Sequence, residues 1–130
     1  MERFVPKEAV SHGVVLVVED ERVSRKALAT LLASSGYSTE TVESAEEALD
    51  VVNEGKPPEV ALIDLDLPGM NGVELISRLA RTQPSVKSIL ITAVDRERLD
   101  PILRRFGVTH LRKPIDFGNL LHILQSGIAN

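Results

Sequence analysis

Short apolar runs alternate along the chain with segments whose apolar residues recur at helical spacing. The short runs are rich in β-branched residues and stop at turn or charged residues, which is typical of buried strands. Between them, apolar residues recur every three or four positions, as on one face of an amphipathic helix. The apolar runs predict strands over residues 14–18, 60–65, 86–94 and 108–112, and residues 37–42, where apolar and polar residues alternate, are predicted to form a short strand. The pattern therefore predicts five strand–helix units.

Capping residues mark most of the predicted helix boundaries. The first helix covers residues 20–35 and ends before Gly36, because glycine suits a left-handed helix cap. Ser44 and Glu47 have the spacing of a capping box at the start of the second helix. Asp116 is placed to cap the last helix. These signals support separate helices between the strands.

The fourth helix is expected to be short or irregular. Asp100 followed by Pro101 matches an N-cap with proline at the first helical position. Proline inside a helix removes a hydrogen bond and clashes with the preceding turn. We therefore expect a helix over residues 101–106, closed by Gly107, with residues 95–99 as a loop.

The alternation of strands and helices predicts the fold class. Repeated strand–helix units form a parallel sheet with right-handed crossovers. Five units in 130 residues suit a flavodoxin-like, doubly wound α/β sheet of order 2-1-3-4-5 with five helices. We expect residues 1–12 to be a flexible leader and residues 13–127 to form one domain.

Polar residues stand where four of the five predicted strands end. They are Glu19 and Asp20 after the first strand, Asp64 in the third, Thr92 in the fourth and Lys113 after the fifth. Ligands of open parallel sheets bind outside the carboxyl ends of the strands. Three close carboxylates repel one another unless a cation intervenes. This set therefore suits a hard cation such as Mg²⁺ together with a phosphoryl group.

Each of these residues also has a simpler explanation when it is taken alone. The acidic pair could cap a helix N-terminus, where the helix dipole favours negative charge. Asp64 could form a turn, Thr92 could be an ordinary strand residue, and Lys113 could be a solvated charge. Their joint occurrence at four strand ends favours a common site.

Composition and charge exclude several function classes. The chain carries 15 basic and 19 acidic residues, and its net charge of −4 gives no basic surface for direct nucleic-acid binding. It contains no cysteine, which excludes thiol catalysis and thiolate metal sites. No apolar stretch is long enough to span a membrane, and the N-terminus does not resemble a signal peptide. These features favour a cytoplasmic location.

Four short motifs contain these polar residues: residues 17–21 with the acidic pair, residues 62–72 with Asp64, residues 91–93 with Thr92 and residues 112–114 with Lys113. In this order they resemble the acidic, phosphorylation-site, switch-threonine and lysine motifs in the receiver domain of bacterial two-component response regulators. The resemblance covers about residues 14–126. It implies a phosphorylation-dependent signalling switch that assists its own phosphorylation and dephosphorylation but is not an enzyme.

The resemblance also implies roles for the acidic residues. Asp64 would accept a phosphoryl group from a sensor histidine kinase or a histidine phosphotransfer protein. Asp20 and Asp64 would bind Mg²⁺ directly, and Glu19 would act through water. The backbone carbonyl of Asp66 would complete the protein ligands.

The remaining implied roles concern the conformational switch. Thr92 would move to bond the phosphoryl group, and Lys113 would pair with it. Receivers often carry tyrosine or phenylalanine three residues before the lysine, where this chain has His110. A mobile histidine that adds pH sensitivity and a half-exposed, silent histidine both stay open. A homodimer through the fourth helix, fifth strand and fifth helix also stays open.

Two rival functions remain. A pseudo-receiver would keep the fold but bind partners without phosphorylation. Asp64 and Asp66 also resemble the D-x-D motif of haloacid-dehalogenase-type phosphatases, in which the second aspartate is a general acid. That motif normally opens its domain, whereas here Glu19 and Asp20 precede it, which disfavours a phosphatase.

Overall fold

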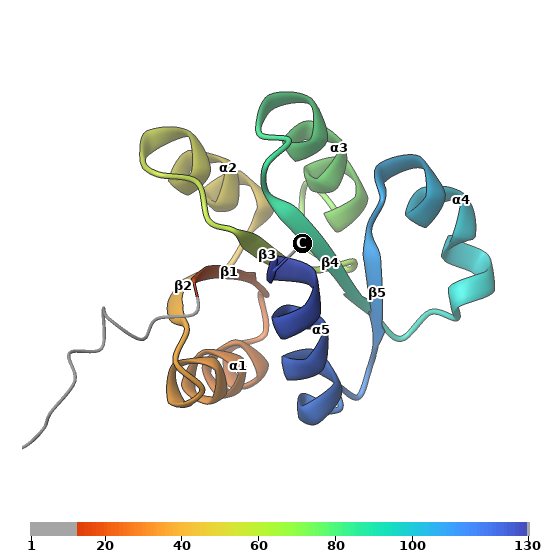
Figure 1. Cartoon of the computed structure of the whole chain (residues 1–130). Coiled ribbons are helices and arrows are strands. Elements are labelled where there is room, and N and C mark those ends of the chain that lie inside the picture. Colours follow the sequence, from red (N-terminus) through yellow and green to blue (C-terminus); the bar gives the residue numbers. More distant parts are fainter. Residues whose placement is uncertain (1–12, 130) are drawn as a thin grey trace, which may run out of the picture.

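The protein is a five-stranded parallel sheet between two layers of helices (Figure 1). The computed structural model describes residues 13–129, so the leader expected for residues 1–12 lies outside the described residues. The strands are β1 (Val14–Val18), β2 (Ser38–Val42), β3 (Val60–Asp64), β4 (Lys87–Thr92) and β5 (Thr109–Arg112). Their order is β2-β1-β3-β4-β5, which confirms the predicted flavodoxin-like topology.

Two helices cover one face of the sheet and three cover the other (Figure 1). The helices are α1 (Arg22–Ser34), α2 (Ala45–Glu54), α3 (Gly72–Thr82), α4 (Arg96–Phe106) and α5 (Phe117–Ala129). The apolar residues of α1 and α5 pack on one side, and those of α2, α3 and α4 pack on the other. The five helices are therefore distributed as a doubly wound sheet requires.

The continuous apolar runs explain why the sheet has a core on each face. Successive strand residues point to opposite faces. In β1, Val15 and Val17 pack in the core beneath α1 and α5, whereas Leu16 and Val18 pack in the core beneath α2, α3 and α4. A strand buried on both faces needs apolar residues at every position.

Three of the helix caps agree with the sequence signals. Gly36 after α1 has φ 95°, in the left-handed region. Before α2, the Glu47 backbone N–H donates to Ser44 Oγ at 3.1 Å. The Glu47 carboxylate accepts from the N–H of Glu43 at 2.7 Å, one residue earlier than in a standard capping box. The Asn119 N–H donates to Asp116 Oδ1 at 3.0 Å at the start of α5.

The expectation of a short fourth helix over residues 101–106 was wrong. Helix α4 begins at Arg96, and Pro101 lies inside it. Leu99 and Leu103 of this helix are 4% and 5% exposed and pack on the sheet. Burying a leucine stabilises by roughly 1.5 to 3 kcal/mol, whereas an internal proline costs roughly 3 kcal/mol. Two buried leucines therefore outweigh the proline.

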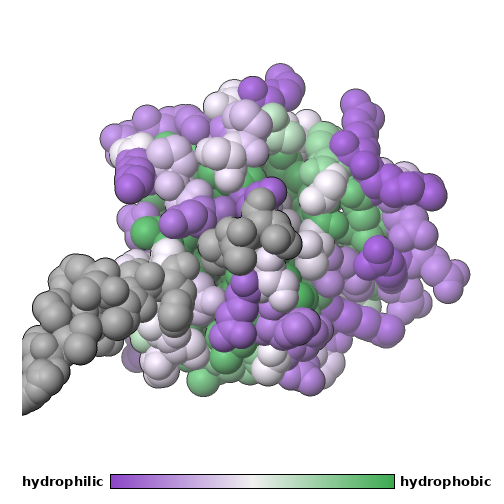
Figure 2. Space-filling model, in the orientation of Figure 1, coloured by the Kyte–Doolittle hydropathy of each residue, from purple (hydrophilic) through white to green (hydrophobic). Residues whose placement is uncertain are grey.

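The outer surface of α4 is strongly hydrophilic. Figure 2 shows hydrophilic side chains gathered on the side of the molecule where Figure 1 places α4. The exposed residues of this helix include Arg96, Arg98, Arg104 and Arg105. Within the part of the chain that the structure describes, no helix is both long and apolar enough to span a membrane.

The correction to α4 predicts the effect of shortening Leu99. Leu99→Ala should lower the free energy of unfolding by about 2 to 4 kcal/mol, because it leaves a cavity in a packed core. Arg98→Ala, at an exposed neighbouring position, should change it by less than about 0.5 kcal/mol. Urea unfolding measures both values. Equal small effects would mean that residues 96–100 form a loop.

Candidate functional site

Three carboxylates meet at the carboxyl ends of β1 and β3. One oxygen from each of Glu19, Asp20 and Asp64 lies within 4.8 Å of the others. Glu19 and Asp64 are each 3% exposed, whereas Asp20 is open to solvent. The strand order explains the arrangement, because β1 and β3 are neighbours and run in the same direction. The structure thus brings these three predicted residues together.

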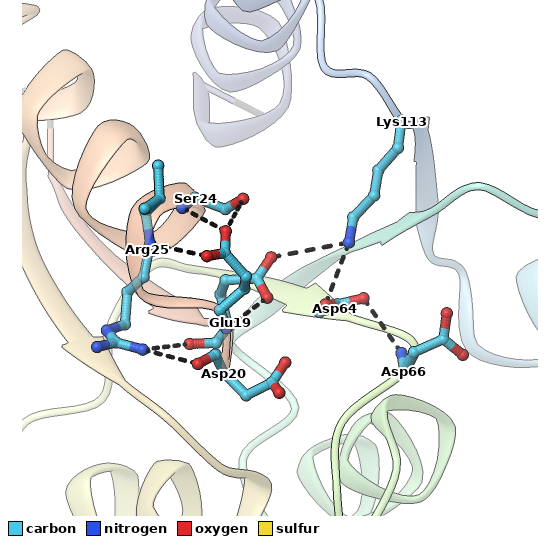
Figure 3. A network of polar contacts seen from close by, with 9 residues as sticks. Glu19, Asp20, Ser24, Arg25, Asp64, Asp66 and Lys113 are labelled. Carbon is cyan, nitrogen blue, oxygen red and sulfur yellow. Dashed lines mark hydrogen bonds and ion pairs between the residues drawn. The ribbon is translucent and has the colours of Figure 1, made fainter.

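Lys113 reaches into the cluster from the end of β5 (Figure 3). Its Nζ lies 3.2 Å from Asp64 Oδ2 and 3.8 Å from Glu19 Oε1. Burial alone would lower the pKa of Lys113, but the charge and hydrogen bond of Asp64, helped by Glu19 and Asp66, raise it on balance. Lys113 is therefore a firmly held ammonium group between the two buried carboxylates.

The environment of Glu19 in this cluster raises the pKa of its carboxyl group. Burial raises the pKa of Glu19 to about 7, and its hydrogen bond and charge interaction with Asp64 add to the effect. A hydrogen bond from the Glu21 N–H, at 3.1 Å, and the charge of Lys113 act in the opposite direction but do not cancel it. Burial is thus the main reason that the charged form of Glu19 is disfavoured, and a cation placed beside the carboxylate would favour that charged form.

Both oxygens of Asp64 have partners. Asp64 is the last residue of β3, and its Oδ1 accepts from the backbone N–H of Asp66 at 3.1 Å. Its Oδ2 accepts from Lys113. The next residue, Leu65, donates its N–H to the carbonyl of Ile91 at 2.9 Å, which keeps the chain attached to β4. The carboxylate is therefore held in one orientation at the sheet edge.

An open hollow of about 430 Å³ lies beside the cluster. It is lined by Asp20, Leu65, Asp66, Leu67, Pro68 and Asn71. Asp66 is exposed, lines this hollow and lies beside Asp64 (Figure 3). The hollow gives a hydrated cation or a phosphoryl group access to the carboxylates.

Thr92 is the fully buried last residue of β4. Its Oγ1 accepts from the backbone N–H of Val94 at 3.0 Å, and its carbonyl accepts from the N–H of Lys113 at 2.9 Å. The threonine thus connects the strand bearing the lysine with the segment that leads into α4. A hydroxyl that accepts one hydrogen bond can still donate its own proton.

His110 lies on β5 opposite Leu90 and is half-buried. Among the contacts described for residues 13–129, none joins it to the acidic cluster. Its Nε2 is buried and has no hydrogen-bond partner within the described chain. A buried unpaired nitrogen costs roughly 1 to 3 kcal/mol. The choice between a silent and a mobile histidine stays open.

Two residues near the site were missed by the sequence analysis. Gly72, at the start of α3, packs so closely that a Cβ would lie 2.5 Å from the carbonyl oxygen of Asp64. Arg25, in α1, donates hydrogen bonds to the backbone of the acidic pair. The glycine in the turn after Asp64 was a usable signal for close packing. Nothing in the local pattern distinguishes Arg25 from Arg22, the other arginine of α1.

Comparison with known proteins identifies the family. A family model described as "Response regulator receiver domain" matches residues 15–125. Two-component response regulator ORR6 of Oryza sativa subsp. japonica is 36% identical over 114 residues, covering 83% of this chain and 66% of that protein. Sporulation initiation phosphotransferase F of Bacillus subtilis is 28% identical over 107 residues, covering 82% of this chain and 86% of that protein.

Solved structures give the same result. Response regulator protein TrrA from Thermotoga maritima, in complex with Mg(2+)-BeF, has a TM-score of 0.77 at 28% identity and covers 87% of this chain and 96% of that chain. The receiver domain of the Francisella response regulator 1452 has a TM-score of 0.83 at 23% identity, which shows likeness of fold. It covers 90% of this chain and 97% of that chain.

Other curated relatives are much longer than this chain. The match spans 26% of the DNA-binding transcriptional regulator NtrC of Klebsiella pneumoniae, at 28% identity. It spans 21% of a cyclic di-GMP phosphodiesterase of Thermotoga maritima, at 35% identity. The shared part is therefore the receiver domain and not the remainder of those proteins.

The chain belongs to the response regulator receiver family. This confirms the resemblance drawn from the four motifs and the function class predicted with it, a phosphoacceptor switch in two-component signalling. The family is a signalling family. The carboxylate cluster has the donor set that a hard divalent cation requires.

The raised pKa of Glu19 predicts an unusual pH dependence of the metal-free protein. The folded state holds a proton between pH 4.5 and about 7 that the unfolded chain releases. Without divalent cations, the contribution of Glu19 to the free energy of unfolding is therefore fully present below about pH 4.5 and is lost as the pH rises through 7. The full loss should be roughly 3 kcal/mol, because the pKa rises from 4.5 to about 7 and one pKa unit corresponds to about 1.4 kcal/mol.

Urea unfolding in a chelator, from about pH 5 to pH 8, measures this contribution. Glu19→Gln removes the titrating group, so its unfolding free energy should depend less on pH than that of the wild type. Identical pH profiles for the two proteins would contradict the raised pKa.

Proposed function

We propose that this chain is a phosphorylation-dependent switch in which Asp64 accepts a phosphoryl group. One observation carries the proposal: Lys113 Nζ lies between Asp64 Oδ2 at 3.2 Å and Glu19 Oε1 at 3.8 Å, beside an open hollow. A carboxylate held at a sheet edge beside a fixed ammonium group can attack phosphorus. An Asp64 oxygen forms the new O–P bond, and the P–N bond of a phosphohistidine donor breaks. The bonding pair goes to the departing imidazole nitrogen, which takes up a proton from water.

The acidic cluster is proposed to hold Mg²⁺. Asp20 and Asp64 would bind it directly, Glu19 through water, and Asp66 through its backbone carbonyl. All of these are oxygen donors, which Mg²⁺ prefers. The bound cation supplies charge neutralisation for the carboxylates and for the oxygens of the incoming phosphoryl group. A solved relative, TrrA, carries Mg(2+)-BeF, which supports the assignment.

Lys113 and Thr92 are proposed to convert phosphorylation into a change of conformation. Lys113 would pair with a phosphoryl oxygen, and the hydroxyl of Thr92 would donate to another. Thr92 Oγ1 now accepts from the N–H of Val94, so a shift of Thr92 also affects the segment that leads into α4. New contacts to the phosphoryl group would favour one of two pre-existing conformations. His110, on the neighbouring strand, stays a candidate second switch residue.

The proposed donor is a sensor histidine kinase or a histidine phosphotransfer protein. The proposed domain covers residues 13–127 and acts in the cytoplasm, without direct contact with nucleic acid or membrane. The domain would assist its own phosphorylation and dephosphorylation rather than turn over a substrate. A homodimer through α4, β5 and α5 stays open.

The acceptor assignment predicts that Asp64→Asn abolishes phosphoryl uptake. The amide is a far weaker nucleophile than the carboxylate, while its similar size preserves the fold. Intact-protein mass is measured before and after incubation with acetyl phosphate and Mg²⁺. The wild type should gain one phosphoryl group, and Asp64→Asn should gain none. Asp50→Asn, an exposed aspartate on α2, is the matched control and should behave like the wild type.

Two outcomes would contradict this proposal. Phosphoryl uptake by Asp64→Asn at the wild-type rate would place the acceptor elsewhere. A wild type that gains no phosphoryl group from acetyl phosphate or from a phosphorylated histidine phosphotransfer protein would favour the pseudo-receiver. Hydrolysis of phosphate monoesters with many turnovers would instead favour the D-x-D phosphatase.

A further inference from the structure

Arg25 hydrogen-bonds the backbone of Glu19 and Asp20 on the side of this acidic pair that faces away from Asp64. Its Nη1 donates to the carbonyl oxygen of Glu19 at 3.0 Å and to that of Asp20 at 3.2 Å. Its Nη2 lies 3.9 Å from Glu43 Oε2, and its side chain is only 16% exposed. Figure 3 shows the guanidinium group on one side of the acidic pair, with Asp64 and Lys113 on the other.

The two carbonyl groups that Arg25 binds lie in a segment between a strand and a helix, where few other backbone hydrogen bonds are described. Glu19 and Asp20 lie between the end of β1 at Val18 and the helix cap at Glu21. The regular hydrogen bonds of a strand or helix therefore do not orient these carbonyl groups. The Glu19 N–H donates to the carbonyl of Val42 at 3.2 Å, which fixes one end of the segment. Arg25 fixes the peptide groups that follow.

Fixing these two peptide groups also directs the carboxylates. The direction of a side chain depends on the backbone dihedral angles on either side of its Cα. With the carbonyl groups of Glu19 and Asp20 turned towards Arg25, their side chains extend from the same segment towards Asp64 (Figure 3). No contact between Arg25 and the carboxylates of this pair is described in residues 13–129. The effect of Arg25 on them is therefore exerted through the backbone.

We propose that Arg25 is a positioning residue of the metal site, which preorganises Glu19 and Asp20 for a divalent cation. This inference rests on the proposed function, because it requires that the acidic cluster binds Mg²⁺. Residues that orient metal ligands typically contribute about 10- to 100-fold to metal affinity. Removing the guanidinium group should therefore weaken Mg²⁺ binding although every ligand remains.

The test compares Mg²⁺ dissociation constants, measured by isothermal titration calorimetry on the metal-free protein. Arg25→Met keeps the aliphatic length but removes the donors, and it should raise the dissociation constant about 10-fold. Arg25→Lys keeps the charge but not the planar guanidinium group, so its dissociation constant should lie between those of the wild type and Arg25→Met. Glu43→Gln leaves both carbonyl bonds intact and should bind like the wild type. Arg22→Met, at an exposed position of the same helix, is the matched control.

A second readout separates positioning from a general loss of stability. The Mg²⁺ concentration that gives half of the maximal phosphorylation rate should rise in Arg25→Met. The rate at saturating Mg²⁺ should stay close to that of the wild type. A lower melting temperature with an unchanged Mg²⁺ dissociation constant would overturn the inference. An equal loss of affinity in Arg22→Met would also overturn it.

The outcomes also separate this inference from the proposed function. A wild type that does not bind Mg²⁺ would defeat the proposed metal site itself. A wild type that binds Mg²⁺ while Arg25→Met binds it equally well would defeat only the role of Arg25. If Arg25→Met does not fold, Arg25→Lys is compared with Glu43→Gln. If both of these variants bind Mg²⁺ as tightly as the wild type, the inference is overturned.

Discussion

The structure of the site depends on an imbalance of charge. Three carboxylate oxygens lie within 4.8 Å of one another, and one ammonium group, that of Lys113, is in contact with two of the carboxylates. Burial, with a smaller contribution from Asp64, raises the pKa of Glu19 to about 7, so its charged form is disfavoured unless further positive charge lies beside it. Such a site gains stability from any positive charge that enters it, so it favours a divalent cation and, with it, the oxygens of a phosphoryl group.

The fold imposes this crowding. Parallel neighbours β1 and β3 place Glu19, Asp20 and Asp64 at one edge of the sheet, and the register of β4 and β5 places Lys113 beside Thr92. Close packing of Gly72 against the carbonyl of Asp64 leaves little freedom for the strand end. Because the sheet holds β1 beside β3 and Arg25 holds the backbone of Glu19 and Asp20, the three carboxylates stay close together.

The sequence was a good guide to the elements that depend on local pattern. Apolar runs predicted four of the five strands and the polar residues at their ends, because a strand buried on both faces leaves a clear signal. The exposed edge strand β2 was predicted from alternation instead, and the strand order from the five strand–helix units. The same reasoning failed at α4, where the local preference of Pro101 was outweighed by the burial of Leu99 and Leu103. The contact of Arg25 with the acidic pair was invisible because it depends on a side-chain conformation that no spacing rule encodes.

The most direct test of the account is the melting temperature of the wild-type chain as a function of Mg²⁺ concentration, compared with NaCl at matched ionic strength. A ligand that binds only the folded state raises the melting temperature progressively with its concentration. We predict such a rise with Mg²⁺ near neutral pH, well beyond the change that NaCl produces. Equal melting curves in the two salts would mean that the three carboxylates do not form a cation site, and would contradict the account at its centre.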